Sequence, residues 1–147
     1  MKKRLIKFTT LMSALTILMV TMAFAATNMY GKNYDTTKTG HICSMKAKGD
    51  GDVAQTIVTN TANSKRYYSA YVNRVNMSTG KIIEKDVLEK LVNSGSKITV
   101  SVARYRSTDS RKHEHQAISW NCSTVPSGAG YTNFKDDTLS YTVVQNK

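Results

Sequence analysis

Two histidines separated by one residue form the clearest metal-ligand pattern in this chain. His113 and His115 stand in a strongly charged segment. In an extended strand, residues i and i+2 face the same side, so these two imidazoles are able to share a metal ion. His41 is a third candidate ligand, because it lies two residues before one of two cysteines that we expect to pair. A metal site also needs a further ligand and a hydrogen-bonded second layer, which the sequence does not supply, so solvated histidines in a charged loop are the favoured interpretation.

A cluster of basic residues surrounds the histidine pair and indicates a site for anions. Arginine binds phosphate and carboxylate groups through its planar guanidinium fork. A second basic group lies earlier in the chain, at Lys65, Arg66 and Arg74. The alternative is a solvated surface that Asp109 and Glu114 partly neutralise. The candidate ligand-binding residues are Lys97, Arg104, Arg106, Arg111 and Lys112.

The chain has two cysteines, Cys43 and Cys122, and an even pair in an exported protein favours a disulfide bond. Such a bond would close a loop of about 80 residues and would stabilise the fold by about 4.5 kcal/mol in the chain-entropy model. The pairing argues against a catalytic cysteine, because a disulfide sulfur is not a free thiolate. Metal binding by the two cysteines is the weaker alternative.

Other catalytic patterns are absent from the sequence. There is no G-x-S-x-G nucleophile motif, and the ten acidic residues mostly stand beside basic ones, so no pair of glycosidase carboxylates is visible. The glycine-containing segment at 127–130 lacks the lysine of a phosphate-binding loop. The eight tyrosines are interpreted mainly as strand residues. The sequence therefore predicts no cofactor and no catalytic residue.

The first 25 residues have the order of a secretory signal peptide. A basic start (MKKRLIK) precedes an apolar segment, and small residues at Ala23 and Ala25 fit a signal-peptidase site. Four of the 21 Lys and Arg residues would leave with this signal and all ten acidic residues would remain, so the predicted mature charge is +7. This charge favours anionic partners. Export argues against nucleic acid as the main partner.

Alternating polar and apolar residues predict an all-β antiparallel sandwich of about six to eight strands, Ig-like or jelly-roll-like. Residues 26–40 are predicted to be a flexible leader, and residues 41–147 a single domain. Residues 84–93 have apolar positions at helical spacing and predict one short helix. The predicted strands cover residues 41–48, 53–60, 66–77, 97–106, 115–122 and 138–144.

These observations favour a secreted or cell-surface-associated binding protein without catalytic activity. Its partner would be an anionic envelope polymer, an acidic glycan or another protein. A toxin-like or antimicrobial protein that acts on membranes is the alternative, although the mature chain lacks a long amphipathic helix. An enzyme that uses a histidine-bound metal ranks last.

Overall fold

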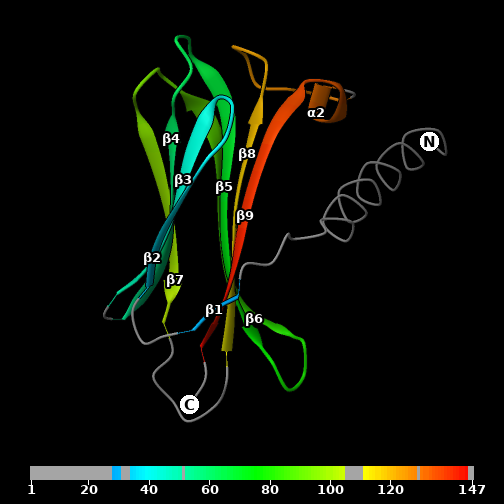
Figure 1. Ribbon diagram of the computed structural model, residues 1–147. Helices are drawn as coiled ribbons and strands as arrows, with labels where there is room; N and C mark the ends of the chain where they lie inside the picture. Colours follow the sequence, from blue (N-terminus) through cyan, green and yellow to red (C-terminus); the bar gives the residue numbers. More distant parts are fainter. Residues whose placement is uncertain (1–27, 31–33, 51, 105–110, 129, 146–147) are drawn as a thin grey trace, which may run out of the picture.

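The chain folds as two β-sheets packed face to face (Figure 1). A computed structural model describes residues 28–30, 34–50, 52–104, 111–128 and 130–145. One sheet has the strand order β1-β9-β8-β5-β6 and the other has the order β2-β3-β4-β7. The elements are β1 (Asn28–Tyr30), β2 (Tyr34–Thr39), β3 (Cys43–Asp50), β4 (Val53–Asn60), β5 (Arg66–Asn76), β6 (Ile82–Val92), β7 (Lys97–Ala103), β8 (Arg111–Trp120), the short helix α2 (Gly130–Asn133) and β9 (Lys135–Gln145).

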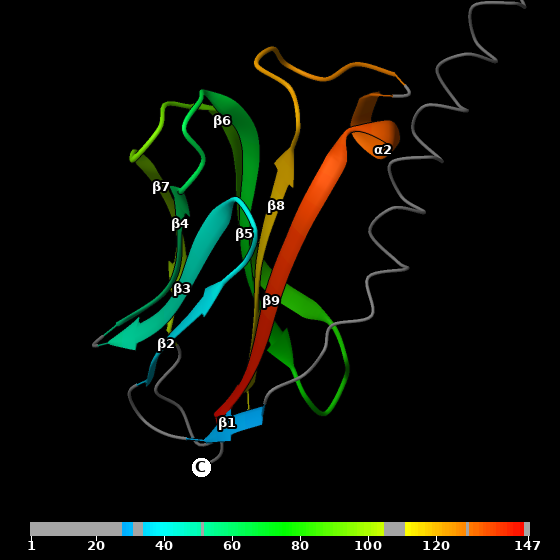
Figure 2. The same ribbon diagram turned by 45° about the horizontal axis from the view of Figure 1, so that its top comes forward.

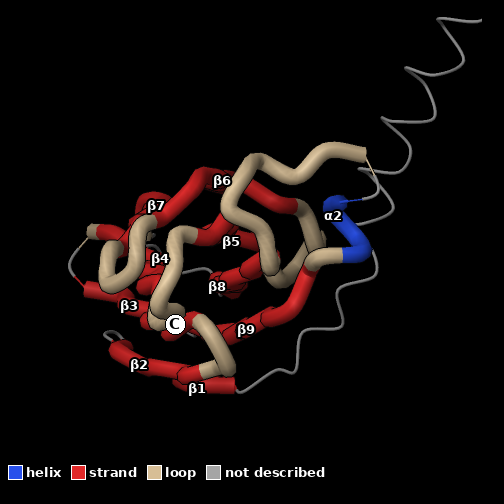
Figure 3. The backbone as a smooth tube through the Cα atoms, turned by 90° about the horizontal axis from the view of Figure 1, so that it is seen from above, coloured by secondary structure: helices blue, strands red, loops and turns tan. Residues whose placement is uncertain are grey.

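This arrangement confirms the predicted all-β class and the antiparallel sandwich, with nine strands in the described residues in place of six to eight. All strand pairs are antiparallel except β1 with β9, which is parallel. Seen along the sandwich, the two sheets form two layers, with β6 and β7 at neighbouring edges (Figure 3).

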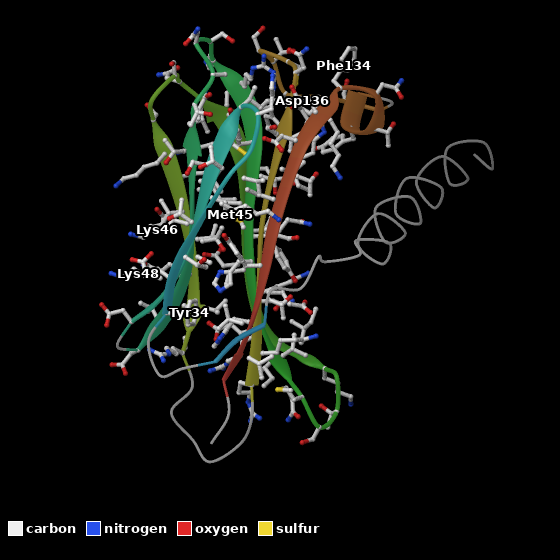
Figure 4. All side chains as sticks on the ribbon, viewed as in Figure 1. Tyr34, Met45, Lys46, Lys48, Phe134 and Asp136 are labelled. Atoms are coloured by element: carbon white, nitrogen blue, oxygen red, sulfur yellow. The ribbon has the colours of Figure 1, made fainter. Side chains whose placement is uncertain are left out.

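Alternation along the strands determines which side chains form the core. Met45 points into the space between the sheets, whereas Lys46 and Lys48 point outward from β3 (Figure 4). Successive residues of a strand face opposite sides of the sheet, so an alternating sequence buries one face. The main core contains Tyr34, Cys43, Met45, Ala47, Ala54, Val58, Tyr68, Ala70, Val72, Val92, Ile98, Val100, Val102, Ala117, Leu139, Tyr141 and Val143.

A smaller core covers the outer face of the five-stranded sheet. Tyr67, Ile118 and Trp120 are buried there, on the side of the sheet opposite to Tyr68 and the main core. Tyr131 of α2 packs edge-on against Trp120 at 5.8 Å between ring centroids, and the Trp120 indole N–H donates to the Tyr131 carbonyl oxygen at 2.8 Å. The connection between β8 and β9 is therefore held over this second cluster.

The predicted helix at 84–93 is wrong, because residues 84–92 lie in strand β6, which pairs with β5. Leu88 and Val92 contact the main core, while Leu91 contacts the outer cluster. A spacing of four residues is even, so it places two side chains on one face of a strand as well as of a helix. β6 is an edge strand, and the charged residues that suggested helical ion pairs are typical of such edges.

Two strands lie in the segment that was predicted to be a leader. β1 joins the five-stranded sheet beside β9, and β2 joins the four-stranded sheet beside β3. The predicted signal peptide lies outside the described residues. In the described part of the chain, no helix has the length and apolar character needed to cross a bilayer.

Candidate functional site

Three arginines meet at the end of the sandwich where β7 ends and β8 begins, and we call this region the arginine end. Arg104 directly follows β7, on the face that carries Val100 and Val102, and it is buried. Arg111 opens β8 and is also buried. Arg74 of β5 donates from Nη1 to the Ala103 carbonyl oxygen at 3.1 Å. This contact links the two sheets beside Arg104.

The predicted basic cluster is therefore only partly brought together. Lys97 begins β7, about 23 Å from Arg104 at a rise of about 3.3 Å per residue, so it belongs to the opposite end. Lys112 faces outward and forms an ion pair with Glu114 at 2.7 Å. Arg106 lies outside the described residues.

Arg74 belongs to this site although the sequence placed it in a separate basic group. It faces His113 across the β5–β8 pair, and its Nη2 atom lies 3.2 Å from a Glu84 carboxylate oxygen. Strand parity offered a signal, because Arg74 follows Ala70 and Val72 at intervals of two residues. This signal places Arg74 beside His113 only once the pairing of β5 with β8 is known.

The two histidines lie in a central strand and are fully buried, so the interpretation of solvated loop histidines is wrong. Both rings face the space between the sheets, with centroids 6.4 Å apart, as their i, i+2 spacing predicted. Pairing of β8 with both β5 and β9 extends the strand back to Arg111. Buried tyrosine and threonine hydroxyls on other strands form hydrogen bonds with the His115 ring.

His115 belongs to a closed hydrogen-bond network. The Thr56 hydroxyl donates to the Tyr71 carbonyl oxygen at 2.8 Å, so its oxygen is left to accept from His115 Nδ1–H, 2.9 Å away. The other ring nitrogen, Nε2, then accepts from the Tyr34 hydroxyl at 2.9 Å. Nδ1 therefore donates and Nε2 accepts, which is the hydrogen-bond pattern of a neutral histidine protonated on Nδ1. Burial, together with the neighbouring His113, lowers the pKa of His115 to about 3, which keeps it neutral.

His113 differs from His115 because, within the described residues, neither of its ring nitrogens has a hydrogen-bond partner. Leaving a buried polar group unpaired costs about 1–3 kcal/mol. Burial, reinforced by the positive charges of Arg104 and Arg74, lowers the pKa of His113 to about 4. The electrostatic field inside the arginine end is therefore positive at the position of this ring.

Tyr34 closes the arginine end from the side of β2, and the sequence did not single it out. Its ring lies over Gly49, where a β-carbon would overlap with ring atoms, and the Arg104 guanidinium stands 5.9 Å above its centroid. Figure 4 shows the Tyr34 side chain in the lower half of the sandwich. Burial raises the pKa of the Tyr34 hydroxyl, against the opposing effect of Arg104, so the hydroxyl stays protonated.

The possible metal site is not assembled. His41 is exposed in the turn before β3, near the end of the sandwich opposite to His113. Both nitrogens of His115 are already engaged by Tyr34 and Thr56. Across the described residues, no group of three or more His, Cys, Asp or Glu side chains is placed to hold a metal ion.

The predicted disulfide bond is also wrong, because Cys43 and Cys122 are free thiols. Cys43 lies in the main core and its thiol donates to an Asp137 carboxylate oxygen at 3.6 Å, whereas Cys122 packs against the outer cluster. The five-stranded sheet separates these clusters. Burial, with Asp137 adding to the effect, raises the pKa of Cys43, so this thiol stays protonated and unreactive.

No known protein family and no curated protein matches this chain. The chemistry of the site therefore carries the functional argument. The candidate site consists of inward-facing arginines at one end of the sandwich, a neutral histidine network behind them and outward-facing lysines around them.

Proposed function

We propose that this protein is exported and binds an anionic component of a cell surface at the arginine end, without catalysis. The observation that carries the proposal is the location at one end of the sandwich of three arginines, Arg74 on β5, Arg111 on β8 and Arg104 directly after β7. Burial is the main cause of the lowered pKa of His113, and the positive charges of Arg104 and Arg74 add to it at the same end. A positive field of this kind attracts phosphate, sulfate or carboxylate groups of a polymer.

Exposed lysines extend this field to the surface. Lys81 and Lys85 are exposed beside Arg74, on the hairpin that joins β5 to β6. Lys112 stands on the neighbouring strand opposite Val75. The buried guanidinium groups contribute to the positive field, and the exposed ammonium groups are the cations that an oxyanion meets at the surface.

The histidines support binding better than catalysis. A general base must reach the proton it removes, yet His115 is fully buried and both of its nitrogens are used inside the network. The Tyr34–His115–Thr56 network instead ties β2, β8 and β4 together behind the arginines. We interpret it as the support that keeps the arginine end in place.

Binding to immobilised poly(glycerol phosphate) at increasing salt concentration tests this proposal. The double variant Arg104→Met/Arg111→Met keeps apolar side chains at the two buried positions and removes both charges. Its affinity should fall about tenfold or more, the equivalent of about 1.4 kcal/mol. The affinity of the parent should decrease with added salt, because ions screen exposed charges.

Lys97→Met is the matched control, because it removes one charge at the opposite end of β7. This variant should bind within about twofold of the parent, which is less than half a kcal/mol. The emission of the buried Trp120 reports whether each variant is folded. A folded double variant that binds like the parent would contradict the proposal, as would equal losses in the double variant and the control.

A further inference from the structure

Exposed apolar side chains gather on one hairpin beside the arginine end. Figures 1 and 2 show the hairpin between β5 and β6 extending past the neighbouring strands. Of seven exposed large hydrophobic residues in the described part of the chain, three belong to the tip of this hairpin. Their exposed fractions are 43% for Met77, 54% for Ile82 and 46% for Ile83. Single exposed apolar residues are ordinary, but a group at one projecting tip marks a contact site.

The tip is held in a defined shape. The Asn76 side-chain oxygen accepts from the backbone N–H groups of Ser78 at 2.9 Å and Thr79 at 3.1 Å, and the Asn76 N–H donates to the Lys81 carbonyl oxygen at 2.9 Å. Gly80 completes the turn with φ of 68°, a conformation that L side chains rarely adopt. The apolar residues are therefore presented by an ordered turn.

A β-bulge sets the base of the tip. Val75 pairs with Ile82 and Arg74 pairs with Glu84, so Ile83 is the extra residue of β6. Bulges bend a strand and redirect its side chains. Below the bulge, Glu84 and Asp86 accept hydrogen bonds from backbone N–H groups of β7, which fixes the hairpin to the other sheet.

The surroundings of the tip are basic. Among the turn residues 77–81, the residues from Asn73 to Asn76 and their partners on β6 and β8, five are basic and two, Glu84 and Glu114, are acidic. The five are Arg74, Lys81, Lys85, Arg111 and Lys112. An apolar tip surrounded by cations matches the interface of an anionic bilayer, where apolar groups enter the headgroup region and cations meet lipid phosphates.

We propose that the anionic partner is a lipid surface and that the β5–β6 hairpin is the element that contacts it. This inference rests on the proposed function, because it uses the same positive end. It adds a specific requirement, since a wholly hydrophilic polymer would gain nothing from Met77, Ile82 and Ile83. Partial insertion of these side chains would remove apolar area from water while the exposed Lys81 and Lys85 stay at the headgroups.

Co-sedimentation of the full exported protein with unilamellar vesicles tests the proposal. Vesicles of equal parts phosphatidylglycerol and phosphatidylcholine should bind the parent, and high salt should weaken the binding. Vesicles of phosphatidylcholine alone should bind it at least about tenfold more weakly. The variant Ile82→Ser/Ile83→Ser should lose about tenfold or more of the affinity for anionic vesicles, because it removes exposed apolar area only.

Two further variants serve as controls. One keeps the apolar character of the hairpin tip but changes the shape of its side chains, and the other removes exposed apolar residues from a different part of the surface. Ile82→Leu/Ile83→Leu should bind like the parent. Val125→Ser/Phe134→Ser removes the exposed apolar residues of the connection between β8 and β9, away from the hairpin, and should also bind like the parent. If the serine hairpin variant were poorly folded, Met77→Ser offers a milder change that should give a smaller loss in the same direction.

Each outcome distinguishes the lipid inference from the proposed function. A parent that binds poly(glycerol phosphate) but not anionic vesicles would overturn the lipid inference and leave the proposed function standing. Equal binding of vesicles by the parent and the folded serine hairpin variant would overturn the role of the hairpin. A parent that binds neither probe would overturn both. Loss of vesicle binding in the hairpin variant, with polymer binding retained, would support both.

Discussion

Acid should destabilise the folded protein well above the pH at which most carboxylates titrate. Burial lowers the pKa of His113 to about 4 and that of His115 to about 3, whereas an unfolded histidine titrates near about 6.5. Below pH 6.5 or so, the unfolded chain takes up protons that the folded chain does not bind, so acid favours unfolding. The stability from the neutral histidines is fully present above this pH and is lost as the pH falls towards the two lowered values.

The size of the effect follows from proton linkage. At about pH 5, each histidine should contribute about 2 kcal/mol of destabilisation relative to about pH 7.5, because each is protonated only in the unfolded chain. The two together should reduce the free energy of unfolding by about 4 kcal/mol, a large part of the 5–15 kcal/mol that holds a typical domain folded. Repulsion from Arg104 and Arg74 acts in the same direction at His113.

Urea unfolding at a series of pH values, followed by the fluorescence of Trp120, measures this directly. Trp120 is the only tryptophan and is buried. His113→Leu should lose about half of the pH dependence and should be more stable than the parent at about pH 5, because no hydrogen bond is lost with the ring. The exposed His41 provides the control, His41→Gln. If His113→Leu kept the full pH dependence of the parent, protonation of His113 in the unfolded chain would not be a source of the acid sensitivity.

Three further predictions concern the fold around the site. Gly49→Ala should lower the free energy of unfolding by about 1–3 kcal/mol because its β-carbon overlaps with the Tyr34 ring, and an unchanged urea midpoint would contradict this packing. Thiol titration of the unfolded protein without reductant should find two free thiols, Cys43 and Cys122, and a result near zero would show that they pair. Tyr131→Ala should shift Trp120 emission to longer wavelength, because it exposes the indole to water. An unshifted spectrum would show that Tyr131 does not shield Trp120.

The central strands of the fold are predictable from sequence, because polar and apolar residues alternate regularly along them. The predicted and observed bounds of β4 coincide, and those of β7 begin at the same residue. β6 is not readable in this way, because its apolar residues contact both cores and its charged residues protect an edge. The turn that contains Gly95 joins β6 to β7, where the sequence predicted a short helix followed by a strand.

The candidate site was only partly predictable for a different reason. Spacing alone places His113 and His115 on one face, but burial of that face depends on the second sheet, which packs over it. The partners of His115 lie 59 and 81 residues away in sequence, at Thr56 and Tyr34. The disulfide prediction was wrong because the number of cysteines does not indicate which face of a sheet each cysteine occupies.

The arginine end and its β5–β6 hairpin together form the proposed binding surface of the sandwich. Backbone amide NMR shifts of the full exported protein, recorded with and without short-chain phosphatidylglycerol, locate the residues that respond to the lipid. We expect shift changes concentrated in the β5–β6 hairpin and around Arg104 and Arg111, with little change near Lys97. Changes concentrated around Lys97 and the opposite end, or spread evenly over both sheets, would contradict the claim.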